Sequence, residues 1–176
     1  RRQRQMCIRD STYTVGKKAY GYLGLGDLFV LIFFGFVAVI GVFYLQAHEI
    51  KPQIFLPALG CGLLSVAVLN INNLRDIEQD RKAGKNTLIV RIGSANGRKY
   101  HVALLVVAML SYLVFALTEL RHWYNYLFLL ATPLLAKHAL FVYRHQNPAE
   151  LRPILGQMAG LALITNLLFS LSIVLG

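Results

Sequence analysis

The sequence predicts an all-α membrane protein, a polytopic bundle of five transmembrane helices. Three observations favour this fold class: hydrophobic residues make up 56% of the 176 residues, the mean hydropathy is +0.53, and five apolar runs alternate with short charged segments. A run of about 18 or more apolar residues can cross the ~30 Å hydrocarbon core as a helix. Ordinary soluble domains and disordered chains are both much less apolar.

The charge and the cysteines exclude other classes. A formal net charge of +10 could indicate a nucleic-acid partner. The positive residues, however, lie between apolar runs and form no aromatic-rich basic surface, so we expect a lipid bilayer and no nucleic acid. Cys7 and Cys61 are far apart, and Cys61 lies between two glycines in an apolar run, which favours helix packing over a disulfide. The five histidines lack metal-ligand spacing, and we assign them no chemistry.

The chain before the first apolar run divides into two parts. Residues 1–11 are basic and polar, and we interpret them as an extraneous tail. Residues 12–176 are expected to form one membrane domain. Residues 12–27 are rich in glycine and tyrosine, carry Lys17 and Lys18, and end at Asp27, which is expected to cap the first helix.

The five predicted spans follow in order. In the first, Gly35 and Gly41 offer close contact with other helices. The second continues beyond its apolar part through Asn72, and Pro57 is tolerable in its first turns. The fourth is interrupted by Pro133 and two polar residues. The apolar runs are residues 28–45, 54–69, 100–118, 123–142 and 153–176.

A dense block of charge follows the second span. If residues 63–80 form one helix, Asn72, Asp76 and Asp80 lie on one face at four-residue steps. Two like charges at that spacing, at the negative end of a helix, are unfavourable unless a cation binds them. Mg²⁺ prefers oxygen ligands and usually rests on one or two carboxylates plus substrate phosphates. The donors that follow suit phosphate oxygens: Gly84, Lys85, Asn86, Thr87 and Arg91.

An alternative remains open on spacing alone. The block could be a solvated helix end, in which Arg75, Arg81 and Lys82 offset the acids. Its position at the end of a membrane helix favours a functional role, because ionisable residues there are candidates for one.

The same residues resemble a known family. The run Asn72-x-x-Arg75-Asp76-x-x-x-Asp80, followed by Gly84-Lys85-x-Thr87 and Arg91-x-Gly93, resembles the second aspartate-rich motif of the UbiA superfamily of intramembrane prenyltransferases. Within it, the form is most similar to the 1,4-dihydroxy-2-naphthoate branch of menaquinone synthesis. Tyr13-x-x-x-Lys17-Lys18 resembles a further element of the family near its active site, with Lys18 in place of arginine.

The resemblance implies a function and a set of site residues. It implies Mg²⁺-dependent transfer of a polyprenyl group from an allylic diphosphate to the aromatic ring of a dihydroxynaphthoate. Asp76 and Asp80 would be catalytic metal ligands, with Asn72 as a supporting oxygen donor. The residues expected to bind the diphosphate are Arg75, Lys85, Arg91, Tyr13 and Lys17.

The resemblance also implies that the chain is the C-terminal part of a nine-helix prenyltransferase fold. The family has a first aspartate-rich motif in its N-terminal half, and this sequence contains none, so we expect the chain alone to be inactive. Three alternatives stay open: another aromatic acceptor, a membrane transporter or channel, and a structural subunit. A transporter would carry polar residues near mid-membrane in several helices, and only Lys137, His138 and Asn166 fit that description.

The distribution of positive residues predicts the orientation. Lysines and arginines concentrate between residues 75 and 99 and in the other loops on that side of the membrane, namely Lys17, Lys18, Arg144 and Arg152. The other side has only Lys51 and Arg121. By the positive-inside rule, the charged block is therefore expected in the cytoplasm, at a bacterial inner membrane.

Overall fold

The computed structural model describes residues 24–145 and 147–175. The tail of residues 1–11, Tyr13 and Lys17 lie outside the described residues. Within the described part, the chain is helical without strands, and five helices are long and apolar enough to cross a membrane. The predicted fold class is confirmed. The spans are Gly26–Ala47, Pro52–Arg75, Leu88–Glu119, Trp123–Arg144 and Leu151–Val174.

Several spans are built from more than one kind of helix. The first joins α2 (Gly26–Val30), the π-helix η2 (Leu31–Ile40) and α3 (Gly41–Ala47). The second joins the 3₁₀ turn η3 (Pro52–Ile54) to α4 (Phe55–Arg75). The remaining elements are α5 (Ile77–Lys82), α6 (Leu88–Glu119), η4 (Trp123–Ala131), α7 (Thr132–Arg144), η5 (Pro148–Glu150) and α8 (Leu151–Val174).

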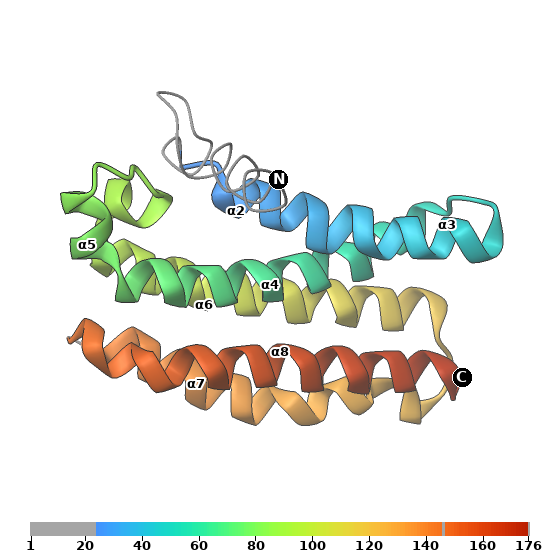
Figure 1. The fold of residues 1–176 in the computed structure, drawn as a ribbon. Helices are drawn as coiled ribbons and strands as arrows, with labels where there is room; N and C mark the ends of the chain where they lie inside the picture. The colour runs from blue at the N-terminus through green and yellow to red at the C-terminus, as the bar shows by residue number, and fades with distance from the viewer. Residues whose placement is uncertain (1–23, 146, 176) are drawn as a thin grey trace, which may run out of the picture.

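Helix α4 occupies the centre of the bundle, where it contacts η2 on one side and α6 and α8 on the other (Figure 1). Half of its apolar window is buried, compared with 6% for the first span. Successive spans run in opposite directions, so the connections gather at two ends of the bundle (Figure 1). We call the end formed by residues 75–99 and 144–152 the charged end, and the end formed by residues 47–52 and 119–123 the opposite end.

Small residues set how closely the central helices approach. A Cβ at Gly35 would lie 2.6 Å from the carbonyl oxygen of Ala58 and 2.9 Å from the Cα of Gly62, so η2 and α4 are in backbone contact there. A Cβ at Gly60 would overlap the ring of Tyr112 on α6. These contacts confirm the packing role predicted for Gly35 and for the glycines beside Cys61. The prediction for Gly41 is wrong for the part of the chain that the structure describes, where a Cβ at that position would meet no atom within 4 Å.

The predicted capping role of Asp27 is also wrong. Helix α2 begins at Gly26, and no side chain caps it. Asp27 lies in the first turn and is buried. Its carboxylate interacts with the hydroxyl group of Tyr100 on α6 instead of capping its own helix.

Candidate functional site

The charged end begins where α4 stops. The predicted helix over residues 63–80 is wrong, because α4 ends at Arg75, Asp76 leaves helical geometry (φ −98°, ψ 10°), and α5 starts at Ile77. Asp76 thereby takes the N-cap position of α5, with Glu78 and Asp80 in the first turn. Acids are stabilised at the positive end of a helix and destabilised at the negative end. The break therefore gives both aspartates a favourable place at the start of α5, while Asp76 remains the C-cap residue of α4, at its negative end.

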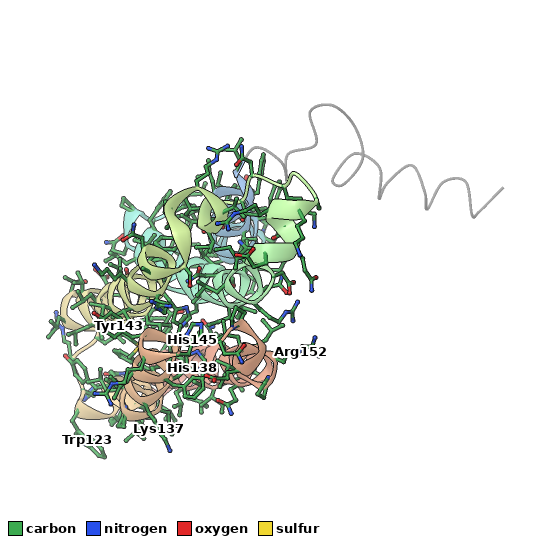
Figure 2. The ribbon with its side chains drawn as sticks, turned by 90° about the vertical axis from the view of Figure 1, so that its left-hand side faces the viewer. Trp123, Lys137, His138, Tyr143, His145 and Arg152 are labelled. Atoms are coloured by element: carbon green, nitrogen blue, oxygen red, sulfur yellow. The ribbon has the colours of Figure 1, made fainter. Side chains whose placement is uncertain are left out.

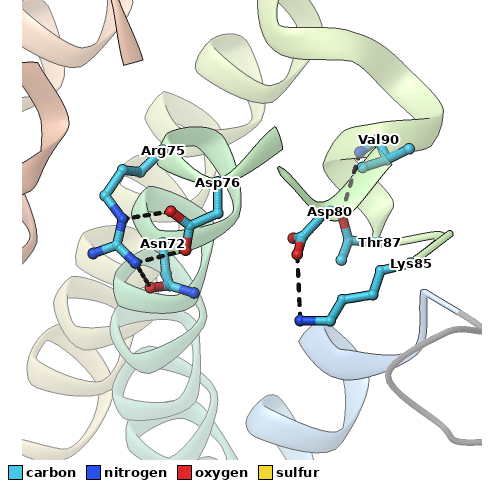
Figure 3. Close-up of polar contacts among 7 residues, drawn as sticks. All are labelled: Asn72, Arg75, Asp76, Asp80, Lys85, Thr87 and Val90. Carbon is cyan, nitrogen blue, oxygen red and sulfur yellow. Dashed lines mark hydrogen bonds and ion pairs between the residues drawn. The ribbon is translucent and has the colours of Figure 1, made fainter. Parts of the chain in front are cut away.

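Three oxygen atoms converge on one cation at this break. Arg75 donates from Nε to Oδ1 of Asp76 at 2.7 Å and from Nη2 to Oδ2 at 2.6 Å. The same Nη2 donates to Oδ1 of Asn72 at 2.7 Å (Figure 3). Because Arg75 donates to the carboxylate, the pKa of Asp76 lies below its ordinary value. The sequence predicts that Asn72, Asp76 and Asp80 share one face. Asn72 and Asp76 do face one point, and the guanidinium of Arg75 occupies it, but Asp80 has no contact with that guanidinium.

The second aspartate has a different partner. Asp80 is buried, and its Oδ1 lies 3.4 Å from Nζ of Lys85 (Figure 3). The backbone closes the same loop, since the amide of Lys85 donates to the carbonyl oxygen of Asp80 at 2.9 Å. Gly84, with φ +71°, makes the intervening turn in a region that favours glycine. The structure therefore brings the predicted residues Asp80 and Lys85 together.

Residues 86–91 follow this loop and include the start of α6. Thr87 caps α6 by accepting a hydrogen bond from the amide of Val90 at 3.3 Å (Figure 3). A Cβ at Gly24 would lie 2.7 Å from the carbonyl oxygen of Asn86 and 3.1 Å from Cζ of Arg91. The entry to the first span therefore packs directly against Arg91, which places this predicted diphosphate-binding residue at the charged end.

One residue near the site was not singled out from the sequence. Arg152, at the start of α8, lowers the pKa of Asp76 by charge, as Lys85 also does. From the sequence, Arg152 contributes only to the predicted orientation of the protein in the membrane. The signal available was its position at the start of the last span, which the antiparallel order of the helices brings to the same end as Arg75.

The donor set suits a hard divalent cation. Two carboxylates and an amide oxygen are the ligand types that Mg²⁺ prefers, and one or two carboxylates suffice when substrate phosphates complete the shell. In the described residues, no group of three or more histidine, cysteine, aspartate or glutamate side chains is arranged to hold a metal. The residues therefore fit a cation shared with a phosphorylated ligand better than a cation held by protein alone.

The polar residues predicted near mid-membrane have different surroundings in the described part of the chain. Viewed along the bundle from the charged end, Lys137 lies at its outer side and His138 lies inside (Figure 2). Asn166 accepts from the hydroxyl of Tyr112 at 2.6 Å and donates to the carbonyl of Ala162. These are contacts between and within helices, so nothing in them favours a transporter.

Sequence spacing also missed a histidine pair. His101 of α6 and His138 of α7 are buried with ring centroids 5.3 Å apart. Among the described residues, none forms a hydrogen bond with a ring nitrogen of either histidine. Their separation in sequence carries no metal-ligand pattern, and only the packing of α6 on α7 brings them together.

The fold and the charged end together define a multi-pass membrane bundle with carboxylates, an amide and several cations gathered at one end. Comparison with known proteins specifies the class. The UbiA prenyltransferase family matches residues 8–167, and the chain belongs to this family.

The most similar relatives agree on one branch. The chain is 63% identical over 165 residues to a 1,4-dihydroxy-2-naphthoate octaprenyltransferase of Haemophilus influenzae, covering 94% of the chain and 54% of the relative. It is 54% identical over 164 residues to the protein of the same description from Escherichia coli, covering 93% of the chain and 53% of the relative. The chain thus spans about half the length of these curated relatives. No solved structure matches it.

Proposed function

We propose that the full-length protein transfers a polyprenyl group from an allylic diphosphate to 1,4-dihydroxy-2-naphthoate in menaquinone biosynthesis. The observation that carries the proposal is the convergence of the Asn72 and Asp76 oxygens on one cationic group, beside the Asp80–Lys85 pair. The naphthoate branch is supported by the two relatives described above, whose similarity extends over nearly the whole chain.

In this proposal, Asp76 and Asp80 are metal ligands, and Asn72 supports them. Bound Mg²⁺ would offset the negative charge that grows on the departing diphosphate. Arg75 would then exchange its contact with Asp76 for the diphosphate, since a guanidinium binds carboxylate and phosphate oxygens with the same fork of donors. Lys85 and Arg91 lie at the same end to contact the remaining phosphate oxygens, and Tyr13 and Lys17 remain predicted members of the site.

The reaction replaces one bond to the allylic carbon with another. The carbon–oxygen bond to diphosphate breaks, and its electron pair leaves with the diphosphate. A ring carbon of the acceptor then bonds to the allylic carbon, the carboxylate leaves as CO₂, and the electron pair of its bond returns to the aromatic ring. The protein's contribution is to orient the diphosphate by its cations at the charged end. The apolar chain of the substrate then extends among the membrane helices.

We also propose the setting of the enzyme. The excess of lysine and arginine at the charged end supports a cytoplasmic position for it, in the inner membrane of a bacterium. Because the chain spans about half of its relatives, we propose that the other half supplies the first aspartate-rich motif. Catalysis would then require both halves.

The experiment tests activity and acceptor together. Membranes containing the full-length protein are given one polyprenyl diphosphate and a mixture of 1,4-dihydroxy-2-naphthoate and 4-hydroxybenzoate, with or without EDTA, and the products are separated by mass. We expect prenylated naphthoate product that EDTA abolishes and Mg²⁺ restores. Preferential prenylation of 4-hydroxybenzoate would overturn the acceptor, and Mg²⁺-dependent product from membranes containing only this chain would overturn the need for the other half.

A further inference from the structure

A groove runs along the outer side of the bundle between α6 and α7. It consists of two adjoining cavities of about 270 and 520 Å³. The first extends to Leu113 and Leu129, and the second extends to Lys99 and Tyr143. Both are lined by the same four small or medium side chains, so they form one continuous groove; these are Val102, Val106, Ala136 and Ala139.

The groove is long and apolar. Lys99 and Leu113 lie fourteen positions apart on one helix, which corresponds to about 21 Å at ~1.5 Å per residue. Half of the ~30 Å hydrocarbon core is ~15 Å, so the groove can hold an extended chain across one leaflet. Apart from Lys99, Thr132 and Tyr143, its lining side chains are hydrocarbon or thioether. Such a surface suits the acyl chain of a lipid.

The groove is polar at the end where Lys99 lies, which we call its mouth. Lys99 lies at the charged end and is exposed. None of the ion pairs that the structure shows among residues 24–145 and 147–175 includes it. The neighbouring Arg98, by contrast, donates to Ser94 and to the carbonyl oxygen of His145. Lys99 is therefore the cation at this mouth that is available to an anionic group, and the half-exposed Tyr143 lies beside it.

We propose that this groove binds an anionic phospholipid, with one acyl chain between α6 and α7 and the headgroup phosphate at Lys99. Ala136 and Ala139 create the depth of the groove, because larger side chains there would fill it. Basic positions between membrane helices on the cytoplasmic side are the sites where anionic lipid headgroups bind. The site does not involve Asp76 or Asp80, so it does not depend on the proposed transfer reaction.

The test uses the purified full-length protein and two lipids of equal acyl composition. Phosphatidylglycerol and phosphatidylcholine are added together in detergent, and the lipids retained by the protein are measured by native mass spectrometry. We expect phosphatidylglycerol to be preferred, Lys99→Gln to reduce its binding about fivefold, and Lys99→Arg to retain it. Ala136→Trp should abolish retention of both lipids, and Ala139→Leu should weaken it if the larger substitution does not fold. Lys51→Gln at the opposite end is the matched control and should change nothing.

Three results would overturn the proposal. The first is equal retention of the two lipids by the unmodified protein, or unchanged retention in Lys99→Gln. The second is displacement of the bound lipid by farnesyl diphosphate in proportion to its concentration, which would assign the groove to an isoprenoid. The third is unchanged retention of both lipids in a folded Ala136→Trp variant, because the acyl chain would then not lie in the groove.

Discussion

The two ends of the bundle contain ion pairs of similar length in different surroundings. At the opposite end, Lys51 and Glu49 approach to 2.8 Å, and both side chains are more than half exposed. At the charged end, Arg75 and Asp76 approach to 2.6 Å with about a quarter of each side chain exposed, and Asp80 is only 11% exposed. Water screens the first pair and screens the others much less. The two ends therefore differ in the burial of their ion pairs and not in the distances between the paired atoms.

The backbone separates the two ends as well. The described glycines with positive φ are Gly24, Gly84 and Gly93, and all three lie at the charged end or against it. At the opposite end, His48 is the residue with positive φ, where it ends α3. If the charged end served only to orient the protein in the membrane, an excess of positive charge would be sufficient. The paired carboxylates and the special backbone at the charged end indicate that this end is built to position side chains.

The largest expected effect comes from the aspartates. In the full-length enzyme, Asp76→Asn or Asp80→Asn should lower prenyl transfer by about 10²–10³-fold, because each removes charge from the proposed electrostatic site. The measurement is the rate of product formation at saturating Mg²⁺ and diphosphate.

Glu78→Gln is the matched control, since it removes the same charge two residues away. Glu78 is exposed and pairs with Arg81 at 3.1 Å, away from Asn72 and Asp76, so its replacement should leave the rate within about threefold. Equal losses in all three variants would show that the block acts through its total charge.

Gly93 offers a way to disturb the charged end through its backbone. Its φ of +80° and ψ of 161° interrupt α6 in a region that is essentially restricted to glycine. Gly93→Ala should therefore destabilise the protein by about 1–3 kcal/mol, although a Cβ there would meet no atom within 4 Å. Gly156→Ala on α8, where a Cβ also meets nothing, should leave the unfolding midpoint in detergent unchanged or raise it. An equal loss of stability in both variants would show that the backbone conformation of Gly93 is not the cause.

The sequence predicts the spans better than it predicts the site. Long apolar runs specify helices, so every predicted span appears. Four of them end within about three residues of the predicted bounds, whereas the third begins twelve residues earlier than predicted, at Leu88. The break at Asp76 was missed because helical spacing is the same for a continuous helix and for two helices joined at one residue. The sequence indicates only that Arg75 could offset the acids of the block, because charge spacing does not show that Asp76 is the partner of its side chain. The His101–His138 contact depends on packing between helices, which no local pattern contains.

Arg75 provides a smaller and pH-dependent effect. Its hydrogen bonds hold the pKa of Asp76 below the ordinary value of 3.8. A lowered pKa contributes stability above the unfolded value, and this stability is lost as the pH falls through the folded value. Arg75→Gln should thus destabilise the protein by about 1 kcal/mol at pH 7 and by less near pH 3, measured by unfolding in detergent. A difference that is the same at both pH values would assign the effect to packing of the side chain.

The smallest effect is expected at the opposite end, in Glu49→Gln. Glu49 raises the pKa of Lys51 above its ordinary value of 10.5 by accepting its hydrogen bond. A raised pKa contributes stability below the unfolded value, and this stability is lost as the pH rises through the folded value. Both side chains are largely exposed, so the conformational entropy lost in holding them together offsets their weak electrostatic attraction in water. The unfolding midpoint of Glu49→Gln should therefore equal that of the unmodified protein at pH 7. Prenyl transfer should also be unchanged. A loss of activity in this variant as large as that in Asp76→Asn would show that the two ends do not differ in function, and the comparison based on burial would fail.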